Sequence, residues 1–267
     1  MGGITDSYIA AIRQRMAVLP PSPSLPQMYN LLHLFARWRS EVLAQTYIAR
    51  HGRTIMAGPF AGMAYASRAT EGALMPRLLG SYEAPLAPHL ARIGAGGLDA
   101  VIDVGCADGY YAVGLARLWP GVSVHAYDID PAARASCAAL AEANGVADRV
   151  VVGERFAPTD FERFADRRTL AVVDIEGAEV DLLRPDLSPA MAAISFIVET
   201  HPGLKPGALD VVRERFHHTH HIERADLQLA AFDLPDWIRE LSHLDQLLAV
   251  WEWRSAPTPW LIMTPKD

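Results

Sequence analysis

The stretch that most constrains the fold is residues 101–131, which read VIDVGCADGYYAVGLARLWPGVSVHAYDIDP. An apolar run predicts a strand, a tight turn containing Gly105 and Gly109 follows, and a helix begins directly after it. Glycine adopts backbone angles that other residues avoid, so such a turn can present backbone N–H groups to a ligand at the helix start. Asp128 follows the second strand, where a carboxylate can bind ribose hydroxyls. The segment therefore predicts a nucleoside-binding strand–turn–helix–strand unit.

Short apolar runs alternate with amphipathic helical segments from residue 98 onward. This alternation predicts parallel strands joined by right-handed crossovers. We expect an α/β, Rossmann-like domain over residues 98–267, built on a doubly wound seven-stranded sheet. Strands are expected at 100–104, 123–127, 149–152, 170–173, 194–198, 221–225 and 260–263, and helices at 131–144, 177–183, 207–216 and near 234–250.

Residues 1–97 have a different texture and are expected to form a helical and hairpin extension. Helical periodicity runs through residues 1–50 and is interrupted by prolines between positions 20 and 26. We expect these helices to pack on the main domain, and a homodimer contact through them is the alternative. A short hairpin is expected around 58–62, and a helix is expected to begin at Ser81.

The hairpin carries three large side chains, Phe60, Met63 and Tyr65, just before the main domain. A segment in this position can close over a substrate and exclude water from it. The hairpin near 59–65 is therefore predicted to form a lid or a wall of the substrate pocket. Structural packing alone is the alternative.

Composition argues against several classes of protein. The chain has 24 Lys and Arg against 31 Asp and Glu, a formal net charge of −7, which disfavours a non-specific nucleic-acid binder. Its two cysteines, Cys106 and Cys137, cannot build a disulfide framework and favour a reducing compartment. No apolar run approaches the roughly 18 residues that span a bilayer. We expect a cytoplasmic protein with neither a nucleic-acid nor a membrane partner.

The glycine turn distinguishes between two kinds of nucleoside ligand. A dinucleotide site would read G-x-G-x-x-G, whereas this turn has Ala107 two residues after Gly105 and Asp108 at the next position. The Asp108 carboxylate would repel a pyrophosphate but would suit a ligand with a cationic amino group. S-adenosylmethionine carries an ammonium and a sulfonium and no phosphate, so the turn favours this methyl donor over NAD. The alternative for Asp108 is a cap on the helix that begins near Tyr110.

At this point the chain resembles the class I S-adenosylmethionine-dependent methyltransferases. DVGCADG is similar to their first motif, and AYDID is similar to their acidic second-strand end. VVDIEGAEVDLL at 172–183 and FIVETH at 196–201 resemble the FkbM-type branch, with its D-x-E-G-x-E segment. The resemblance covers roughly residues 58–222. It implies the strand order 3-2-1-4-5-7-6, S-adenosylmethionine as cofactor, and O-methylation.

In that sheet the fourth and fifth strands are neighbours, and ligands bind at their carboxyl ends. Asp174 and Glu176 leave the fourth strand, and Glu199 and His201 leave the fifth. His201 is predicted to be the general base, with Glu199 orienting it or holding the acceptor. In a second interpretation, Asp174, Glu199 and His201 bind a divalent metal. In a third, His201 is a hydrogen-bonded polar residue at a strand end.

The remaining candidates lie at the ends of the other strands. Glu154 is expected to meet the adenine amino group, with a solvated loop acid as the alternative, and Glu176 is expected to cap a helix beginning at Gly177. The histidine run at 217–221 is expected to be partly exposed, because its side chains diverge. The residues predicted to bind the cofactor are Asp103, Gly105, Ala107, Asp108, Gly109, Asp128, Ile129, Glu154 and Asp174.

Taken together, these patterns predict an S-adenosylmethionine-dependent methyltransferase that acts on a hydroxyl of a small molecule, such as a sugar or secondary metabolite. No Asn/Asp-Pro-Pro-aromatic segment follows the fourth strand, which argues against the enzymes that methylate amino groups of bases and glutamine. Three alternatives stay open. They are N-methylation of a small molecule, NAD-dependent oxidation or reduction, and a non-catalytic cofactor-binding protein with the N-terminal helices as its partner surface.

Overall fold

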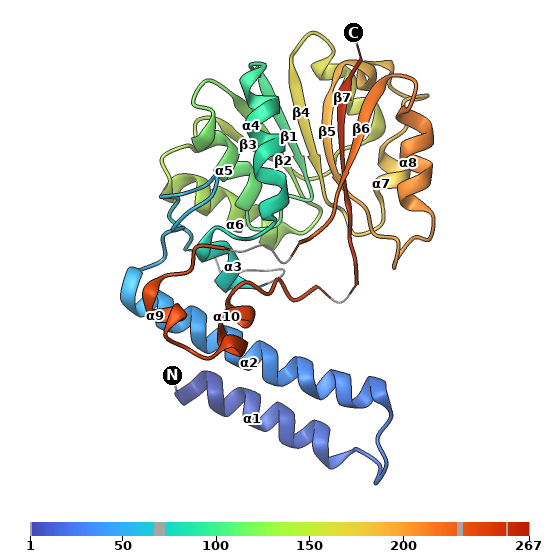
Figure 1. The fold of residues 1–267 in the computed structure, drawn as a ribbon. Coiled ribbons are helices and arrows are strands. Elements are labelled where there is room, and N and C mark those ends of the chain that lie inside the picture. The colour runs from blue at the N-terminus through green and yellow to red at the C-terminus, as the bar shows by residue number, and fades with distance from the viewer. Residues whose placement is uncertain (1, 67–72, 229–231, 255, 267) are drawn as a thin grey trace.

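The computed structural model describes residues 2–66, 73–228, 232–254 and 256–266. Within these residues the chain forms a seven-stranded sheet in the order β3-β2-β1-β4-β5-β7-β6 (Figure 1). Only β7 runs antiparallel to its neighbours β5 and β6. The expected doubly wound sheet and its order are thus confirmed. The strands are β1 (Ala100–Val104), β2 (Ser123–Tyr127), β3 (Val150–Gly153), β4 (Thr169–Val173), β5 (Ser195–Glu199), β6 (His220–Ala225) and β7 (Trp260–Pro265).

Every predicted strand is present, because the central strands are buried on both faces and read as continuous apolar runs. All five residues of β1 and of β4 are buried. Their side chains alternate between two core layers, with Val101 on one side of the sheet and Ile102 on the other. The bounds differ most at β7, which continues to Pro265 because it pairs with β6 up to His220.

Helices cover both faces of the sheet. The first core layer lies under α3 (Leu74–Leu79), α4 (Ala87–Ala95), α5 (Tyr110–Leu118) and α6 (Pro131–Ala143). The second lies under α7 (Glu179–Leu182), α8 (Ala208–Phe216) and the 3₁₀ segments Pro158–Phe164 and Pro189–Ala193.

Three helix predictions need correction. The helix expected at 177–183 is only α7, because Glu176 and Gly177 have φ of +51° and +99° and delay its start. The helix expected from Ser81 begins later, as a 3₁₀ turn at Ala84–Leu86 that leads into α4. The segment near 234–250 forms two short helices, α9 (Asp236–Arg239) and α10 (His243–Ala249), and Ser242 caps the second.

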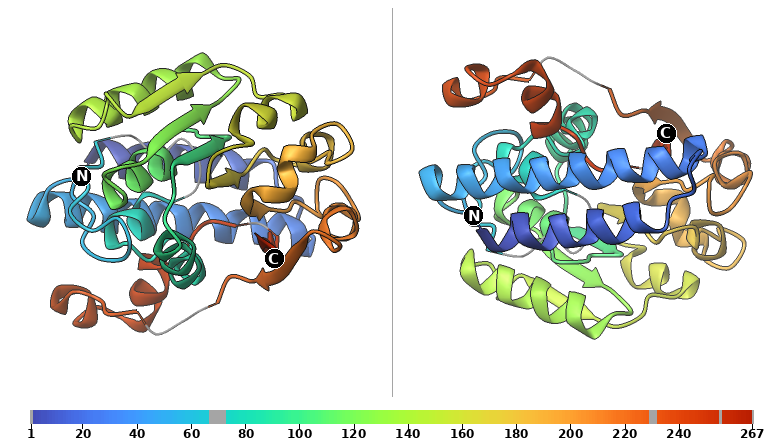
Figure 2. Two further views of the ribbon diagram at one scale, coloured as in Figure 1. Left: turned by 90° about the horizontal axis from the view of Figure 1, so that it is seen from above. Right: turned by 90° about the horizontal axis from the view of Figure 1, so that it is seen from below.

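The N-terminal extension is an antiparallel helical pair, α1 (Gly2–Ala17) and α2 (Leu25–His51). Figures 1 and 2 show this pair beneath the carboxyl ends of the parallel strands. Arg39 of α2 binds both carboxylate oxygens of Asp245 in α10, at 2.6 and 3.0 Å. The extension therefore lies on the side of the sheet where ligands of this fold class bind. Among the described residues no helix is both long and apolar enough to span a bilayer.

The hairpin near 59–65 is held by one antiparallel bridge, between Thr54 and Ala64. Phe60, Met63 and Tyr65 are all buried in the first core layer. This agrees with the alternative of structural packing. None of these three side chains is exposed, as a lid would require.

Candidate functional site

The glycine turn lies directly against the end of β4. β1 and β4 pair in register up to Val104 and Val173, so the next residues, Gly105 and Asp174, stand side by side. An ideal Cβ on Gly105 would lie 1.7 Å from the Asp174 carbonyl oxygen, and φ of Gly105 is +87°. No other residue fits there. The turn and the Asp174 segment are therefore in backbone contact.

The predicted ribose ligand, Asp128, is held by the same turn. Its Oδ2 accepts a hydrogen bond from the Ala107 N–H at 2.9 Å, and its Oδ1 accepts one from the Asp130 N–H at 2.8 Å. Each carboxylate oxygen keeps a lone pair for a further donor. Ile129, next along the chain, is 80% exposed, and Glu154 is also exposed. Both are accessible to a ligand that lies across the turn.

Asp108 does not cap α5, and its predicted contact with the cofactor stays a prediction. Its carboxylate is fully buried, where it accepts a hydrogen bond from the Tyr65 hydroxyl and pairs with Arg77 at 3.4 Å. Gly109 is the N-cap of α5, and no side chain caps that helix. The cause is Arg77 on α3, which is itself buried and requires a counter-charge. Asp108 is thus paired inside the protein, and the predicted cap is wrong.

Asp103 is a second buried acid at the end of β1. Its side chain is buried and its Oδ2 has no hydrogen-bond partner. Burial raises the pKa of Asp103 to about 7, against a hydrogen bond from the Ala112 backbone that lowers it, and the charges of Asp128 and Asp108 add to the increase.

A cavity of about 390 Å³ opens at the carboxyl ends of β4 and β5. Its walls come from the ends of these two strands and from the connection between α10 and β7. The lining residues are Tyr82, Asp174, Glu176, Glu199, His201, Gly203, Leu204, Glu252, Trp253, Arg254, Ala256, Pro257 and Thr258. The three predicted catalytic residues, Asp174, Glu199 and His201, therefore share one cavity.

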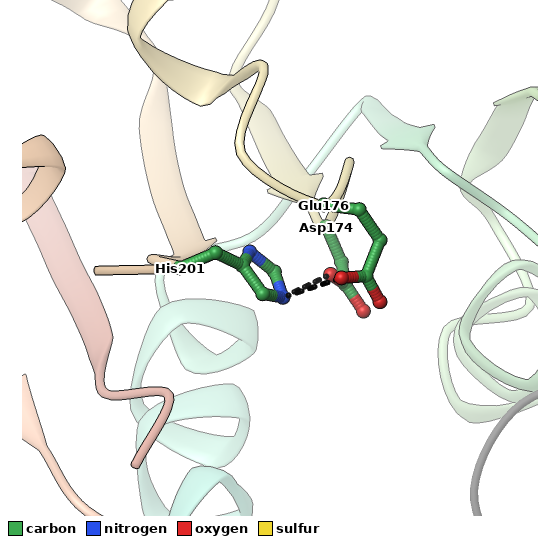
Figure 3. A group of neighbouring side chains, drawn as sticks. All are labelled: Asp174, Glu176 and His201. Atoms are coloured by element: carbon green, nitrogen blue, oxygen red, sulfur yellow. Dashed lines mark ion pairs between the residues drawn. The ribbon is translucent and has the colours of Figure 1, made fainter. Parts of the chain in front are cut away.

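Within this cavity, Asp174, Glu176 and His201 form a close cluster (Figure 3). The His201 Nε2 atom lies 3.6 Å from Oδ1 of Asp174 and 3.5 Å from Oε2 of Glu176. Burial and the nearby charges of Glu199 and Glu83 raise the pKa of Asp174 well above its ordinary value. The predicted metal ligands are Asp174, Glu199 and His201. In the structure Glu176, rather than Glu199, lies beside the imidazole with Asp174.

The residue that orients His201 is Glu179. Its Oε1 lies 2.8 Å from Nδ1 of His201 and also accepts the Gly177 N–H at 3.0 Å. Burial raises the pKa of Glu179, but the hydrogen bonds from His201 and Gly177 outweigh it and lower the pKa overall. Neither the predicted orienting role of Glu199 nor the predicted cap by Glu176 is present. Glu179 is the last acid of the D-x-E-G-x-E segment, so this motif could have identified it from the sequence.

Glu199 instead belongs to a buried ion cluster around Arg254. The guanidinium donates hydrogen bonds to Glu83, to Glu199 and to Glu252, the last at 2.9 Å. Burial, together with the charge of Glu199, raises the pKa of Glu83 to about 7, although Arg254 opposes the increase. One guanidinium thus pairs with three acids, each from a different segment of the chain. The sequence pattern gave no indication of Arg254, because none of its three partners lies within one regular element with it.

His201 is subject to opposing influences. Burial lowers its pKa, but the hydrogen bond to Glu179 and the charges of Glu179, Glu199 and Glu176 outweigh it and raise the pKa overall.

The histidine run at 217–221 is separate from this cavity. His217, His218 and His221 are exposed as expected, but His220 is buried and its Nε2 bonds the Ile194 carbonyl at 2.8 Å.

The raised pKa of Asp103 predicts how stability depends on pH. In the folded chain Asp103 holds its proton up to about pH 7, whereas an unfolded Asp loses it near about pH 4. Between these values the folded state binds more protons, so the free energy of unfolding falls as pH rises. Asp103→Asn should remove this part of the fall, on the order of a few kcal/mol. Urea unfolding across this window tests it, and parallel curves for wild type and variant would contradict it.

Comparisons with known proteins were made by sequence and by structure. No protein-family model matches the chain, and no curated protein matches it in sequence. A solved structure described as the delta-N METTL16 MTase domain is similar, with 10% identity over 87% of this chain and 97% of that one and a TM-score of 0.52.

Two further matches have lower scores. Geranyl diphosphate methyltransferase in complex with SAM has 14% identity, covers 71% of this chain and 86% of its own, and has a TM-score of 0.44. The O-methyltransferase TomG from Streptomyces achromogenes has 14% identity, coverage of 67% and 80%, and a TM-score of 0.40. The METTL16 match and the strand order agree, and the chain has the Rossmann-like fold of class I S-adenosylmethionine-dependent methyltransferases.

Proposed function

We propose that this chain is an S-adenosylmethionine-dependent methyltransferase that methylates a hydroxyl of a small molecule, along the lines of the FkbM-type branch. The observation that carries the proposal is the backbone contact between Gly105 and Asp174. It sets the turn expected to bind the cofactor against a cavity whose polar groups suit an acceptor. A methyl donor on one side and an acceptor on the other would meet at this contact.

The residues around the turn fit the proposed cofactor. Gly105, Ala107 and Gly109 all have positive φ, and Gly105 and Ala107 are partly exposed, whereas Gly109 is buried. Asp128 is held where it can accept hydrogen bonds from ribose hydroxyls. Ile129 offers exposed apolar surface to an adenine ring. The other residues of the predicted set are Asp103, Asp108, Glu154 and Asp174. When bound, S-adenosylmethionine supplies the methyl group and a sulfonium leaving group.

The cavity fits a small acceptor. Its volume of about 390 Å³ lies within the usual range of ligand sites. An acceptor hydroxyl must lose its proton as its oxygen attacks the methyl carbon, and much of the rate gain comes from alignment. The pair of His201 and Glu179 has the arrangement of a base and the group that orients it. Glu199, held by Arg254, forms part of the wall.

A second candidate, N-methylation of a small amine, is favoured by one observation. Among the residues that the structure describes, four carboxylates line the cavity, from Asp174, Glu176, Glu199 and Glu252, against the single guanidinium of Arg254. Such a lining attracts a cationic amine as well as a neutral hydroxyl.

The two cysteines are free and buried, which supports the proposal that the protein works in a reducing compartment such as the cytoplasm.

Cofactor binding is the first test. Calorimetry should detect binding of S-adenosylhomocysteine and none of NAD. Asp128→Ala should weaken S-adenosylhomocysteine binding by about tenfold or more, because it removes hydrogen bonds to a charged acceptor. Asp148→Ala, at an exposed acid, is the matched control. Binding of NAD, or unchanged affinity in Asp128→Ala, would contradict the assignment.

Turnover is the second test. His201→Ala should reduce methyl transfer to a panel of hydroxylated sugars and phenols by a factor on the order of 10² to 10⁴. Its affinity for S-adenosylhomocysteine should stay close to that of wild type, because His201 lies on the acceptor side. His217→Ala, at an exposed histidine, is the control. Full activity in His201→Ala would remove this residue from the reaction.

We also propose that the helical extension makes a homodimer contact. Apolar side chains at helical spacing are exposed along α2, namely Leu25, Met28, Tyr29, Leu32 and Phe35. Light scattering on the 29.2 kDa chain should give twice the chain mass, and Leu32→Ser with Phe35→Ser should give a single chain mass. Leu244→Ser, at an exposed leucine of α10, should leave the mass unchanged. A wild-type monomer would refute the contact.

A further inference from the structure

We propose that Asp174, Glu176 and His201 together bind one divalent metal cation, and that Glu179 fixes the imidazole for this role. The purpose of the ion, activation of an acceptor hydroxyl, rests on the proposed function. The site itself stands on the arrangement of the four side chains. His201 would then be a metal ligand, which is the second interpretation reached from the sequence, with Glu176 as a ligand in place of Glu199.

The first argument concerns the hydrogen on the His201 ring. An ionised carboxylate only accepts hydrogen bonds, so Glu179 requires the hydrogen of His201 to be on Nδ1. In the neutral ring, Nε2 then carries a lone pair. A ligating histidine characteristically donates its other N–H to a carboxylate in this way. Glu179 is fully buried, so the ring is held in one orientation.

The second argument is that Nε2 and the Asp174 oxygen that faces it both lack a hydrogen-bond partner. Within the described residues, Nε2 takes part in no hydrogen bond, and Oδ1 of Asp174 is buried without a hydrogen-bond partner. The His201 side chain is 7% exposed and directs this nitrogen at the two carboxylates (Figure 3). A positive charge is required between these atoms, either a proton on Nε2 or a bound cation, and the Mn²⁺ titration below distinguishes the two.

The third argument is the spacing of the three atoms. Nε2 lies 3.6 Å from the Asp174 oxygen and 3.5 Å from the Glu176 oxygen, and all three atoms lie within 4.8 Å of one another. Two ligands about 2.1 Å from a shared ion stand about 3.4 Å apart at a tetrahedral angle. The two distances from Nε2 are close to this value, and binding of one ion would draw the two carboxylate oxygens toward each other.

The charge around the cluster agrees with this assignment. Glu199 and Glu252 also line the cavity, and Arg254 is the guanidinium that pairs with both of these acids. A divalent ion would offset the excess of negative charge that remains. Glu176 is held at φ +51°, which is an unfavourable conformation for a residue with a side chain. That conformation puts its carboxylate beside His201.

The ligand types narrow the choice of metal. Two carboxylates with one imidazole suit an ion of intermediate hardness, such as Mn²⁺, better than a soft ion that prefers thiolates. Three protein ligands leave positions open toward the cavity. A cation there would lower the pKa of an acceptor hydroxyl.

The test is a titration of the full-length, EDTA-treated protein with Mn²⁺ alone, followed by electron paramagnetic resonance and calorimetry. Wild type should bind one ion per chain. Asp174→Asn and His201→Ala should weaken binding by about 100-fold or more, and Glu179→Gln, which keeps its shape, by about 10- to 100-fold. Glu176→Gln should weaken it as well. Circular dichroism and thermal unfolding verify that each variant is folded.

The matched control is the double variant His217→Ala, His218→Ala, because these exposed histidines are the other group that could capture Mn²⁺. It should bind the ion as wild type does. Absence of binding to wild type, loss of binding in the control, or undiminished binding in Asp174→Asn would each overturn the proposal. Binding of S-adenosylhomocysteine is measured separately. If S-adenosylhomocysteine binds and Mn²⁺ does not, the metal site is refuted and the proposed function stands. If Mn²⁺ binds and S-adenosylhomocysteine does not, the proposed function is refuted and the metal site stands.

Discussion

The contact on which the site depends is the one between two backbones, Gly105 after β1 and the carbonyl of Asp174 after β4. It follows from the register of two fully buried parallel strands, which end at the same level. Because no side chain fits between them, the glycine turn lies directly against Asp174, which lines the acidic cavity. A shift in this register would separate the two halves of the site.

The sheet could be predicted from sequence because its information is local. Buried parallel strands such as β1 and β4 are continuous apolar runs, and the turn at Gly105 is a short pattern with a physical cause. Asp174 and His201 could also be placed together, because the ends of neighbouring strands meet at one edge of the sheet. These inferences need only strand positions and strand order.

The partners of the buried charges could not be predicted in this way. Arg77 holds Asp108 from a helix that the sequence pattern did not reveal, and Arg254 holds Glu199 from the connection before β7. Glu179 replaces Glu199 beside His201 because two residues with positive φ bend the chain after β4. Each pairing depends on how distant segments pack, which periodicity does not encode.

The connection between α10 and β7 supplies one wall of the cavity, through Glu252, Trp253, Arg254, Ala256, Pro257 and Thr258. It contributes no strand to the sheet and lies outside the glycine turn. Arg254 anchors it by ion pairs to Glu199 and Glu83. Under the proposed function, exchange of the side chains around this anchor would change which acceptor is bound, while the glycine turn stays the same. In this architecture, specificity and chemistry would diversify at different rates.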